Sequence, residues 1–355
     1  MKSGSRFHAD ELVEVRSPEE IFATLDKNGQ LEGLPFMPEM LAWSGKRVRV
    51  FKRAHKTCDP ANGIGGRAMP STVHLVDTRC DGSAHGGCQA RCLLFWKDAW
   101  LKRVDESSGA EPNPRKAEET PNRGVSDCTE ADVWTGTRKH DEDDQDPTFV
   151  CQATQVSQAT RPLRWWDPRQ YLEDFTSGNV RLSEMFGTFF YFAYRQLISA
   201  GLGLGVPLLW LYDAFQKLRG RPPYPERVGR IPHGQKTPNL ILALQPGELV
   251  RIRSYDEILN TLDETNHNRG MWFDAEMVPY CGKSYRVLDR VNSIVDEKTG
   301  KLVHLKNDCI VLDKVVCQSC YAKYRVFCPR RIYAYWREIW LERVSTSEQQ
   351  SNKSA

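Results

Sequence analysis

Apolar and charged residues alternate over Glu11 to Arg16 (ELVEVR), which is the two-residue period of a half-buried strand. Ser17-Pro18-Glu19-Glu20 follows and predicts a helix N-terminus with a capping box, opening a short helix through about Leu25. Gly45 to Val50 predicts a further strand, introduced by a glycine turn. The amino-terminal region is therefore predicted to contain short strands with one short helix.

The same pattern returns near the carboxyl end of the chain. Glu11 to Arg53 and Glu248 to Arg290 align without a gap, and 19 of their 43 positions are identical. The copies also end alike, because Trp96 to Val104 (WKDAWLKRV) matches Trp336 to Val344 (WREIWLERV). A repeat of nearly 100 residues is too long for a solenoid unit, so we predict two homologous domains.

The short strands and turns of each copy predict a mainly β fold with some helix, built from two small SH3-like β-barrel modules. Asp296 to Lys301 is the loop of a predicted hairpin between Tyr285 to Ile294 and Leu302 to Leu305. Cys92, Trp96 and Trp100 lie four residues apart, as do the apolar residues 332, 336 and 340. We expect each set to be the core-facing stripe of a tryptophan-rich helix that closes its barrel.

The remaining segments divide the chain into an ordered series of parts. We predict an amino-terminal tail (1–10), the first repeat (11–104), an acidic flexible linker (105–150), a helical apolar segment (151–221), a Pro/Gly linker (222–247), the second repeat (248–344) and a carboxyl-terminal tail (345–355). The acidic linker includes the run His140 to Asp146, which is interpreted as a solvated charge run with a metal site as the alternative.

Phe186 to Tyr212 is the most apolar stretch and contains a single charge, Arg195. Its 27 residues are enough to cross a bilayer, but Arg195 and the interrupting Gly and Pro residues count against a span. Three interpretations stay open: a buried helical hairpin, an interfacial or re-entrant membrane element, and a single span. Trp210, Tyr212 and the basic residues that follow favour a peripheral membrane contact.

The charge and the amino terminus limit the classes of function. The net charge is only +3, so the composition does not indicate a polyanion as the partner. The first residues contain no apolar core of signal-peptide length, so we expect a cytoplasmic protein, with membrane association as an option. In a reducing compartment, eleven cysteines point to metal ligands or redox groups rather than to disulfides.

Four cysteines in each repeat supply the donors of a closed tetrahedral zinc site. The predicted metal ligands are Cys58, Cys80, Cys88 and Cys92 in the first repeat, and Cys309, Cys317, Cys320 and Cys328 in the second. Cys58 is distant in sequence and could be replaced by His55, His74 or His85. Aligned from the shared tryptophan-rich ends, Cys80 falls on Cys320 and Cys88 on Cys328.

Two alternatives to zinc remain for these cysteines. Four thiolates serve an iron–sulfur cluster equally well, and Cys328-Pro329 is similar to the Cys-Pro of ferredoxin runs. The cysteines could also be unmetallated, with a redox pair at Cys317 and Cys320. Cys151 and Cys281 have no counterpart in the duplication, so we expect them to be buried as small apolar residues.

The chain resembles a family of uncharacterised bacterial proteins that share the ELVRIRS to TLD opening, RWWDPRQYLEDFTSGNV, and the FCPR to YWREIWLERV close. The resemblance covers nearly all of the domain sequence. It implies an association with biosynthetic gene clusters for glycans or natural products, but it supplies no activity and no catalytic residue.

No phosphate loop, nucleophile elbow or HExxH motif is found, so whether the chain is an enzyme stays open. Asp81 to Gly87 is the most enzyme-like stretch, with His85 as an acid/base or a ligand. Glu39 and Glu276 occupy the same repeat position and are interpreted as braces of the fold. The leading hypothesis is a zinc-binding accessory or scaffold protein that contacts a partner protein or a membrane surface.

Two other functions remain as alternatives. The first is an iron–sulfur or metal-dependent redox enzyme in a biosynthetic pathway. The second is a nucleic-acid-binding protein, because the basic and aromatic run Tyr321 to Tyr333 could contact phosphates and stack bases. The near-neutral charge balance argues against the second alternative.

Overall fold

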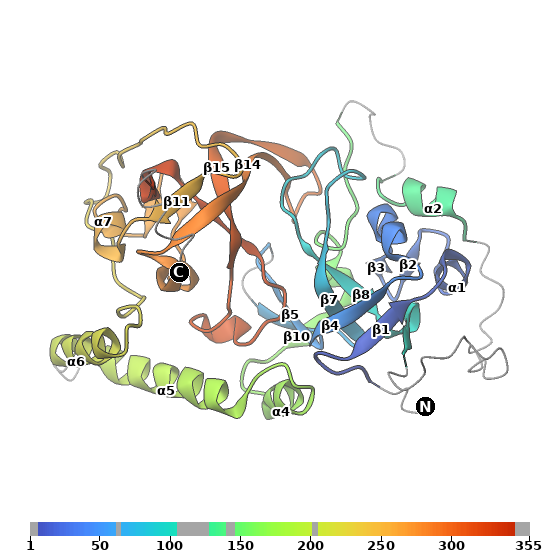
Figure 1. Ribbon diagram of the computed structural model, residues 1–355, viewed down its shortest axis with the longest axis horizontal. Helices are drawn as coiled ribbons and strands as arrows, with labels where there is room; N and C mark the ends of the chain where they lie inside the picture. The colour runs from blue at the N-terminus through green and yellow to red at the C-terminus, as the bar shows by residue number, and fades with distance from the viewer. Residues whose placement is uncertain (1–5, 62–64, 105–127, 140–145, 201–204, 345–355) are drawn as a thin grey trace, which may run out of the picture. The chain divides into compact units, whose positions relative to one another are not determined.

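The computed structural model describes residues 6–61, 65–104, 128–139, 146–200 and 205–344 (Figure 1). The chain forms two compact units. Unit 1 comprises Met1–Arg181, Ser293–Val303 and Phe327–Arg330, and unit 2 comprises Leu182–Asn292, His304–Val326 and Arg331–Ala355. The fold is mixed α/β, and most of its regular elements are strands.

Unit 1 is built on a five-stranded antiparallel sheet in the order β8-β7-β4-β1-β9. These strands are β1 (Leu12–Val15), β4 (Arg47–Arg53), β7 (Thr72–Arg79), β8 (Leu93–Lys97) and β9 (Leu101–Arg103). A three-stranded sheet contains β5 (Lys56–Asp59), β6 (Gly65–Ala68) and β10 (Arg161–Leu163), and β2 (Gln30–Leu31) pairs with β3 (Leu34–Pro35). The helices are α1 (Pro18–Phe22), η1 (Pro38–Trp43), η2 (Asp98–Trp100), α2 (Glu130–Thr135), α3 (Val156–Ala159) and α4 (Pro168–Thr176).

Unit 2 contains a five-stranded sheet in the order β16-β15-β14-β11-β17. The strands are β11 (Leu249–Ile252), β14 (Ser284–Val295), β15 (Leu302–Val316), β16 (Tyr333–Trp336) and β17 (Leu341–Arg343), and β12 (His267–Asn268) pairs with β13 (Met271–Trp272). The helices are α5 (Leu182–Ser199), α6 (Gly205–Leu218), α7 (Tyr255–Leu259), η3 (Ala275–Tyr280), η4 (Lys323–Arg325) and η5 (Glu338–Trp340). The sequence-matched strands therefore occupy matched positions in the two sheets.

Tryptophans fill the core of each unit in the same way. In unit 1, Phe36 packs edge-on against Trp96 and Trp100, and the Trp100 indole donates a hydrogen bond to Thr24 Oγ1 at 3.1 Å. In unit 2, Phe273 packs edge-on against the two matched tryptophans, and Trp340 donates to Thr261 Oγ1 at 2.9 Å. All four indoles are fully buried, and Trp96 also donates its indole N–H to a threonine, Thr78 Oγ1, at 3.0 Å.

The predicted tryptophan-rich helices are wrong, although the predicted burial of these residues is correct. Leu93 to Lys97 forms strand β8, and only the three residues of η2 separate it from strand β9; β16, η5 and β17 repeat this arrangement. A short apolar run fits a buried strand and a buried helix equally well by periodicity. Here Leu93, Leu94, Phe95 and Trp96 are all buried, which is typical of a strand covered on both faces.

The predicted turns and caps are confirmed. Ser17 and Ser254 both cap their helices, and Glu20 and Glu257 complete the capping boxes. The loop from Asp296 to Lys301 joins β14 to β15, with Asp296 Oδ1 accepting the backbone N–H of Thr299 at 2.7 Å. These features depend on contacts within a few residues of sequence, which is why they could be predicted locally.

The acidic segment 105–150 contains more structure than a flexible linker. Thr129 caps α2, and Val133 of this helix is buried in the core of unit 1 together with Cys128. Further on, Phe149 is buried and its backbone N–H bonds to the Gly300 carbonyl at 2.8 Å. Cys128, Val133 and Phe149 are therefore anchored in unit 1, and the run from His140 to residue 145 lies outside the described residues.

Within the apolar segment Phe186 to Tyr212, the described residues form most of α5 and the first half of α6, and these two helices contact each other. Tyr194 of α5 donates its hydroxyl to the Leu208 carbonyl of α6 at 2.7 Å. Among the described residues no helix combines the length and the apolar character needed to cross a membrane. The interpretation as a buried hairpin also needs correction, because α6 has no buried residue.

Candidate metal centre

The loop from Asp81 to Gly87 follows strand β7 and is closed by short-range hydrogen bonds. Asp81 Oδ1 accepts the Ser83 N–H at 2.9 Å, and the Gly82 carbonyl accepts the N–H groups of His85 and Gly87 at 2.9 and 3.0 Å. Gly82 has φ +78°, and a β-carbon there would lie 2.0 Å from the Cys88 carbonyl oxygen. Only glycine permits this turn, and the turn directs His85 into the interior.

A second segment brings a carboxylate to the same place. Pro38 begins the 3-10 helix η1, and Glu39 follows it with a side chain that is only 4% exposed. Charged residues are almost never this deeply buried unless they have a partner. The partners of Glu39 come from the end of β7 and from the loop beyond it.

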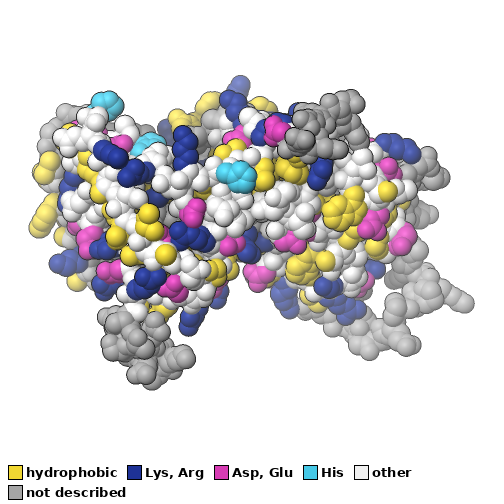
Figure 2. All heavy atoms as spheres, turned by 90° about the horizontal axis from the view of Figure 1, so that it is seen from above, with side chains coloured by type: hydrophobic (Ala, Val, Ile, Leu, Met, Phe, Trp, Pro, Cys, Tyr) yellow, Lys and Arg dark blue, Asp and Glu magenta, His cyan; other side chains and the backbone are white. Residues whose placement is uncertain are grey.

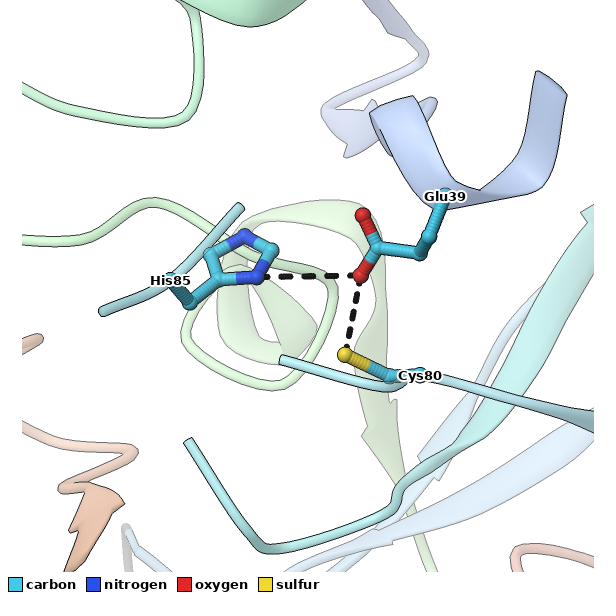
Figure 3. A group of neighbouring side chains, drawn as sticks. All are labelled: Glu39, Cys80 and His85. Carbon is cyan, nitrogen blue, oxygen red and sulfur yellow. Dashed lines mark hydrogen bonds and ion pairs between the residues drawn. The ribbon is translucent and has the colours of Figure 1, made fainter. Parts of the chain in front are cut away.

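Glu39, Cys80 and His85 converge at one point inside unit 1 (Figure 3). Their ligand atoms all lie within 4.8 Å of one another. The Cys80 thiol donates to Glu39 Oε1 at 2.9 Å, and His85 Nδ1 lies 3.7 Å from the same oxygen. Among the described residues this is the one group of three or more His, Cys, Asp or Glu side chains with such convergent donors.

The group leaves buried polar atoms without good hydrogen bonds. Glu39 Oε2 and both ring nitrogens of His85 lie beyond hydrogen-bonding geometry from any described group, and the His85 side chain is only 2% exposed. Burial lowers the pKa of His85. The negative charge of Glu39 and the backbone of Val150 act in the opposite direction and raise it. Buried atoms of this kind cost about 1–3 kcal/mol each when they are unsatisfied.

Three further thiols lie beside this group. Cys80, His85, Cys88, Cys92 and Cys151 line one cavity of about 40 Å³. Burial raises the pKa of Cys92 to about 12 and that of Cys151 to about 11, and burial together with Glu39 raises the pKa of Cys80 far above its usual range. Cys80, Cys92 and Cys151 are therefore thiols unless a cation is present to stabilise their thiolates.

The donor set matches the preferences of zinc. Thiolate sulfur, imidazole nitrogen and carboxylate oxygen are the three protein donors that zinc takes in tetrahedral sites. A water molecule needs about 10–15 Å³ of such volume, so the cavity has room for one ion and its remaining ligand. An iron–sulfur cluster instead requires several thiolates, whereas the convergent group contains a single thiol.

The structure places some of the ligands predicted in the first repeat at one cavity and one of them elsewhere. Cys80, Cys88 and Cys92 line the cavity, and of these three only Cys80 belongs to the convergent group. Cys58 lies on β5 outside this lining, and its carbonyl accepts a hydrogen bond from Arg330 at 3.2 Å. Among the replacements that the sequence offered for Cys58, the structure brings His85 to the site, whereas His55 and His74 bond to the Gln170 and Leu94 carbonyls.

The ligands predicted in the second repeat are not brought together in the described residues. Cys328 belongs to unit 1, whereas Cys309, Cys317 and Cys320 belong to unit 2. The Cys317 sulfur lies 3.4 Å from Ser319 Oγ, and the Cys320 thiol donates to the Gln318 carbonyl at 3.5 Å. No group of three convergent donors forms from these cysteines in the described chain.

Residues at matched positions of the two repeats show why donors converge in unit 1 and not in unit 2 among the described residues. Glu276 matches Glu39 and is also buried, but its Oε1 accepts the N–H groups of Tyr321 and Ala322 at 2.6 and 3.3 Å. The position of His85 in the alignment from the tryptophans is taken by Arg325, which is paired with Asp274. Burial raises the pKa of Glu276, and hydrogen bonds from the backbone of Tyr321 and Cys320 act against this effect. Glu276 Oε2, like Glu39 Oε2, has no hydrogen-bond partner among the described residues, but no convergent group of His and Cys donors includes Glu276 there.

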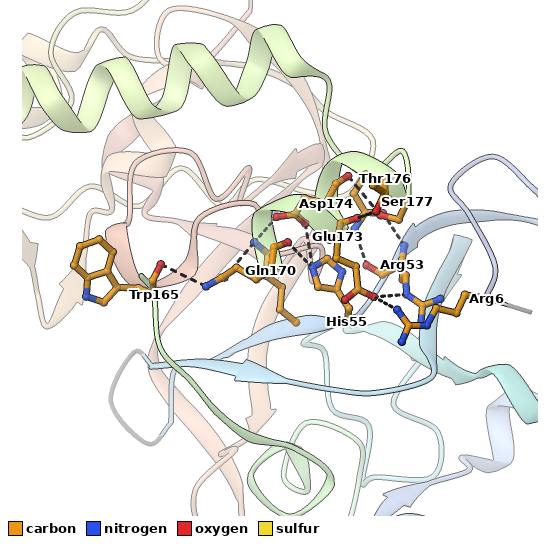
Figure 4. A network of polar contacts seen from close by, with 11 residues as sticks. Arg6, Arg53, His55, Trp165, Gln170, Glu173, Asp174, Thr176 and Ser177 are labelled. Atoms are coloured by element: carbon orange, nitrogen blue, oxygen red, sulfur yellow. Dashed lines mark hydrogen bonds and ion pairs between the residues drawn. The ribbon is translucent and has the colours of Figure 1, made fainter. Parts of the chain in front are cut away.

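A second buried polar cluster holds α4 onto unit 1 (Figure 4). Lys56 bonds to Asp174, Arg53 bonds to Glu173 at 2.8 Å, and His55 Nε2 lies 3.1 Å from the Gln170 carbonyl. Burial raises the pKa of Asp174 to about 6, against the opposing charge of Lys56. Each of these charges has a protein partner, so we assign this cluster to the stability of the fold.

The basic and aromatic run Tyr321 to Tyr333 presents less charge than its sequence suggests. Arg325 is paired with Asp274, and Arg330 is only 2% exposed and donates to Glu297 at 2.7 Å. Figure 2 shows one face of the molecule on which acidic and basic side chains are interspersed. These contacts do not support a phosphate-binding stripe along the run.

The comparisons with known proteins give no relative. No family model matches the chain, and neither a curated protein nor a solved structure matches it. The resemblance to an uncharacterised bacterial family therefore stays a prediction from the motifs.

Sequence reasoning found part of this site. The cysteine clustering indicated Cys80, Cys88 and Cys92, and His85 was identified as an alternative ligand. Glu39 was interpreted as a brace because it occupies the same repeat position as Glu276, and Cys151 as a small buried residue because it has no counterpart in the duplication. The glycine-rich loop around His85 was the local signal, whereas only the fold brings η1 to it.

Proposed function

We propose that this protein is a zinc-binding accessory protein with one mononuclear zinc site, in unit 1. Cys80, His85 and Glu39 hold the ion, and a thiol of the cavity, from Cys88, Cys92 or Cys151, supplies the fourth donor. The observation that carries the proposal is the convergence of three buried donors whose ligand atoms lie within 4.8 Å. The unsatisfied Glu39 and His85 atoms support it, because a cation would satisfy them.

A structural role for zinc fits this site better than a catalytic role. The side chains of Glu39 and His85 are only 4% and 2% exposed, so a substrate would have no route to an open coordination position. The ion would instead connect η1, the end of β7 and the loop that follows. An accessory or scaffold protein, stabilised by metal and acting through contacts with a partner, is consistent with this arrangement.

The two units are proposed to be copies of one small-barrel module that have diverged at this position. The identical sheet order, the matched Phe–Trp packing and the matched Trp–Thr hydrogen bonds support common ancestry. Exchange of the histidine for Arg325, which pairs with Asp274, is proposed to have removed the metal site from unit 2. The proposal therefore gives one zinc per chain instead of one per repeat.

Metal analysis of protein purified without oxygen tests the zinc proposal. We expect about one zinc per chain, no visible absorbance, and a zinc absorption-edge spectrum that requires sulfur together with nitrogen or oxygen neighbours. Iron with sulfide and a brown colour would contradict it in favour of the redox alternative. Protein that binds no zinc after refolding with excess zinc would also contradict it.

A further inference from the structure

Helix α5 belongs to unit 2 and places several large apolar residues on the side that faces away from the rest of this unit. Leu182, Phe186, Phe190 and Leu197 follow one another at helical spacing and are 51, 68, 66 and 55% exposed. The opposite side contains Met185, Thr188 and Tyr191, which are buried. A surface helix of a globular protein normally has the reverse arrangement, with its apolar stripe against the core.

Helix α6 has the same inverted arrangement. Its exposed large hydrophobic residues are Val206, Trp210, Leu211, Phe215 and Leu218, which are 52–86% exposed. The polar residues Tyr212, Asp213 and Gln216 are turned inward and are only partly accessible. The Gln216 side chain donates to the Tyr212 hydroxyl at 3.0 Å.

The polar side of the pair is used to attach it to the rest of unit 2. Arg195 of α5 bonds to Glu226 at 2.5 Å, and Asp213 of α6 accepts the Tyr224 backbone N–H at 2.8 Å. Tyr191 packs edge-on against Tyr321 with ring centroids 5.0 Å apart. Because these contacts fix the inner side, the outer apolar side is held in position and stays exposed.

We propose that the outer face of α5 and α6 docks on the surface of an anionic lipid bilayer, with its aromatic side chains in the interfacial layer. This face is defined by Leu182, Phe186, Phe190, Leu197, Val206, Trp210, Leu211, Phe215 and Leu218. Exposed apolar patches of this kind mark interaction sites. The inference is independent of the zinc proposal.

Two features favour lipid over a protein partner. Protein interfaces form about one hydrogen bond per 100–200 Å², yet the only side-chain hydrogen-bonding group in this set is the Trp210 indole N–H. Lys217, Arg219 and Arg221, all exposed, follow at the end of α6. Basic residues beside a Trp- and Phe-rich face are typical of helices that lie in an anionic membrane surface.

Flotation of the full-length protein with vesicles tests the proposal. We expect binding to vesicles of phosphatidylcholine with 30% phosphatidylserine, weaker binding to pure phosphatidylcholine, and weaker binding in high salt. Phe190→Ser combined with Trp210→Ser should lower the partition coefficient at least tenfold. Trp272→Ser removes an equally large hydrophobic residue that is 48% exposed elsewhere on unit 2, and it should leave binding unchanged.

The outcomes separate the possible occupants of the face. Both serine substitutions are at exposed positions, so circular dichroism and zinc content should match those of the wild type. Absence of vesicle binding by folded wild-type protein would overturn the proposal. A wild-type dimer that becomes monomeric in the double variant, without vesicle binding, would overturn it in favour of a second copy of this chain.

Discussion

At the level of single residues, burial decides the chemistry of the histidines of unit 1. His74 is fully buried and its Nδ1 lies 2.8 Å from the Leu94 carbonyl, which makes it the neutral tautomer with a proton on that nitrogen. His85 is equally buried, but its nearest anion is Glu39. The same residue type thus serves as a core hydrogen-bond donor in one place and as a candidate ligand in the other.

His74 makes the stability of unit 1 depend on pH. Burial lowers its pKa from 6.5 to about 3, so the unfolded chain takes up a proton that the folded chain excludes between these values. Its contribution to stability is present above pH 6.5 and is lost as the pH falls toward 3, by about 1.4 kcal/mol per pH unit. His74→Gln should lower the slope of the unfolding free energy against pH, measured with urea between pH 6 and 4, by about 1.4 kcal/mol per pH unit. Equal slopes for the variant and the wild type would contradict this assignment.

Gly82 is predicted to be the residue of the histidine loop least tolerant of a side chain. Gly82→Ala combines φ +78° with a β-carbon 2.0 Å from the Cys88 carbonyl, and we expect the unfolding free energy to fall by about 3 kcal/mol. Gly87→Ala is the matched control, since Gly87 has φ +77° but no atom within 4 Å of a β-carbon. Gly87→Ala should lower the unfolding free energy by about 1 kcal/mol. If both variants lost the same unfolding free energy in denaturant, the close approach of residue 82 to the Cys88 carbonyl would be unimportant.

At the level of elements, local sequence signals predicted helix caps and turns correctly, whereas they did not predict which distant segments meet in the fold. The two capping boxes and the hairpin at Asp296 to Lys301 were predicted because all their partners lie within a few residues. The tryptophan-rich ends were mistaken for helices, since four-residue spacing also arises when a strand, a 3-10 turn and a second strand follow one another. Glu39 was not recognised as a ligand, because nothing local connects η1 to the loop at His85.

The matched Trp–Thr hydrogen bonds give a prediction about both sheets. Thr24→Val and Thr261→Val each leave a buried indole N–H without its acceptor, so each should lower the unfolding free energy by about 1–3 kcal/mol. Thr24→Ser and Thr261→Ser retain the hydroxyl and should recover most of the loss. If valine and serine were equally destabilising in thermal unfolding, the loss would come from packing and not from the hydrogen bond.

At the level of the whole molecule, two units with the same sheet order differ in what surrounds one buried carboxylate. Glu39 has a thiol and an imidazole beside it, whereas one oxygen of Glu276 accepts two backbone N–H groups. The sequence indicated a metal site in each repeat because it counted cysteines. Cys328 belongs to unit 1, whereas the other three ligands predicted in the second repeat belong to unit 2. A count of cysteines could not reveal this.

The most direct test of this account is the zinc content of two matched variants. Cys80→Ser and Cys320→Ser change the same position of the two repeats, measured on protein purified without oxygen beside the wild type. We predict that Cys80→Ser loses the zinc and lowers the melting temperature, whereas Cys320→Ser retains about one zinc per chain. Full zinc content in Cys80→Ser, or loss of zinc in Cys320→Ser alone, would contradict a single site at Glu39, Cys80 and His85.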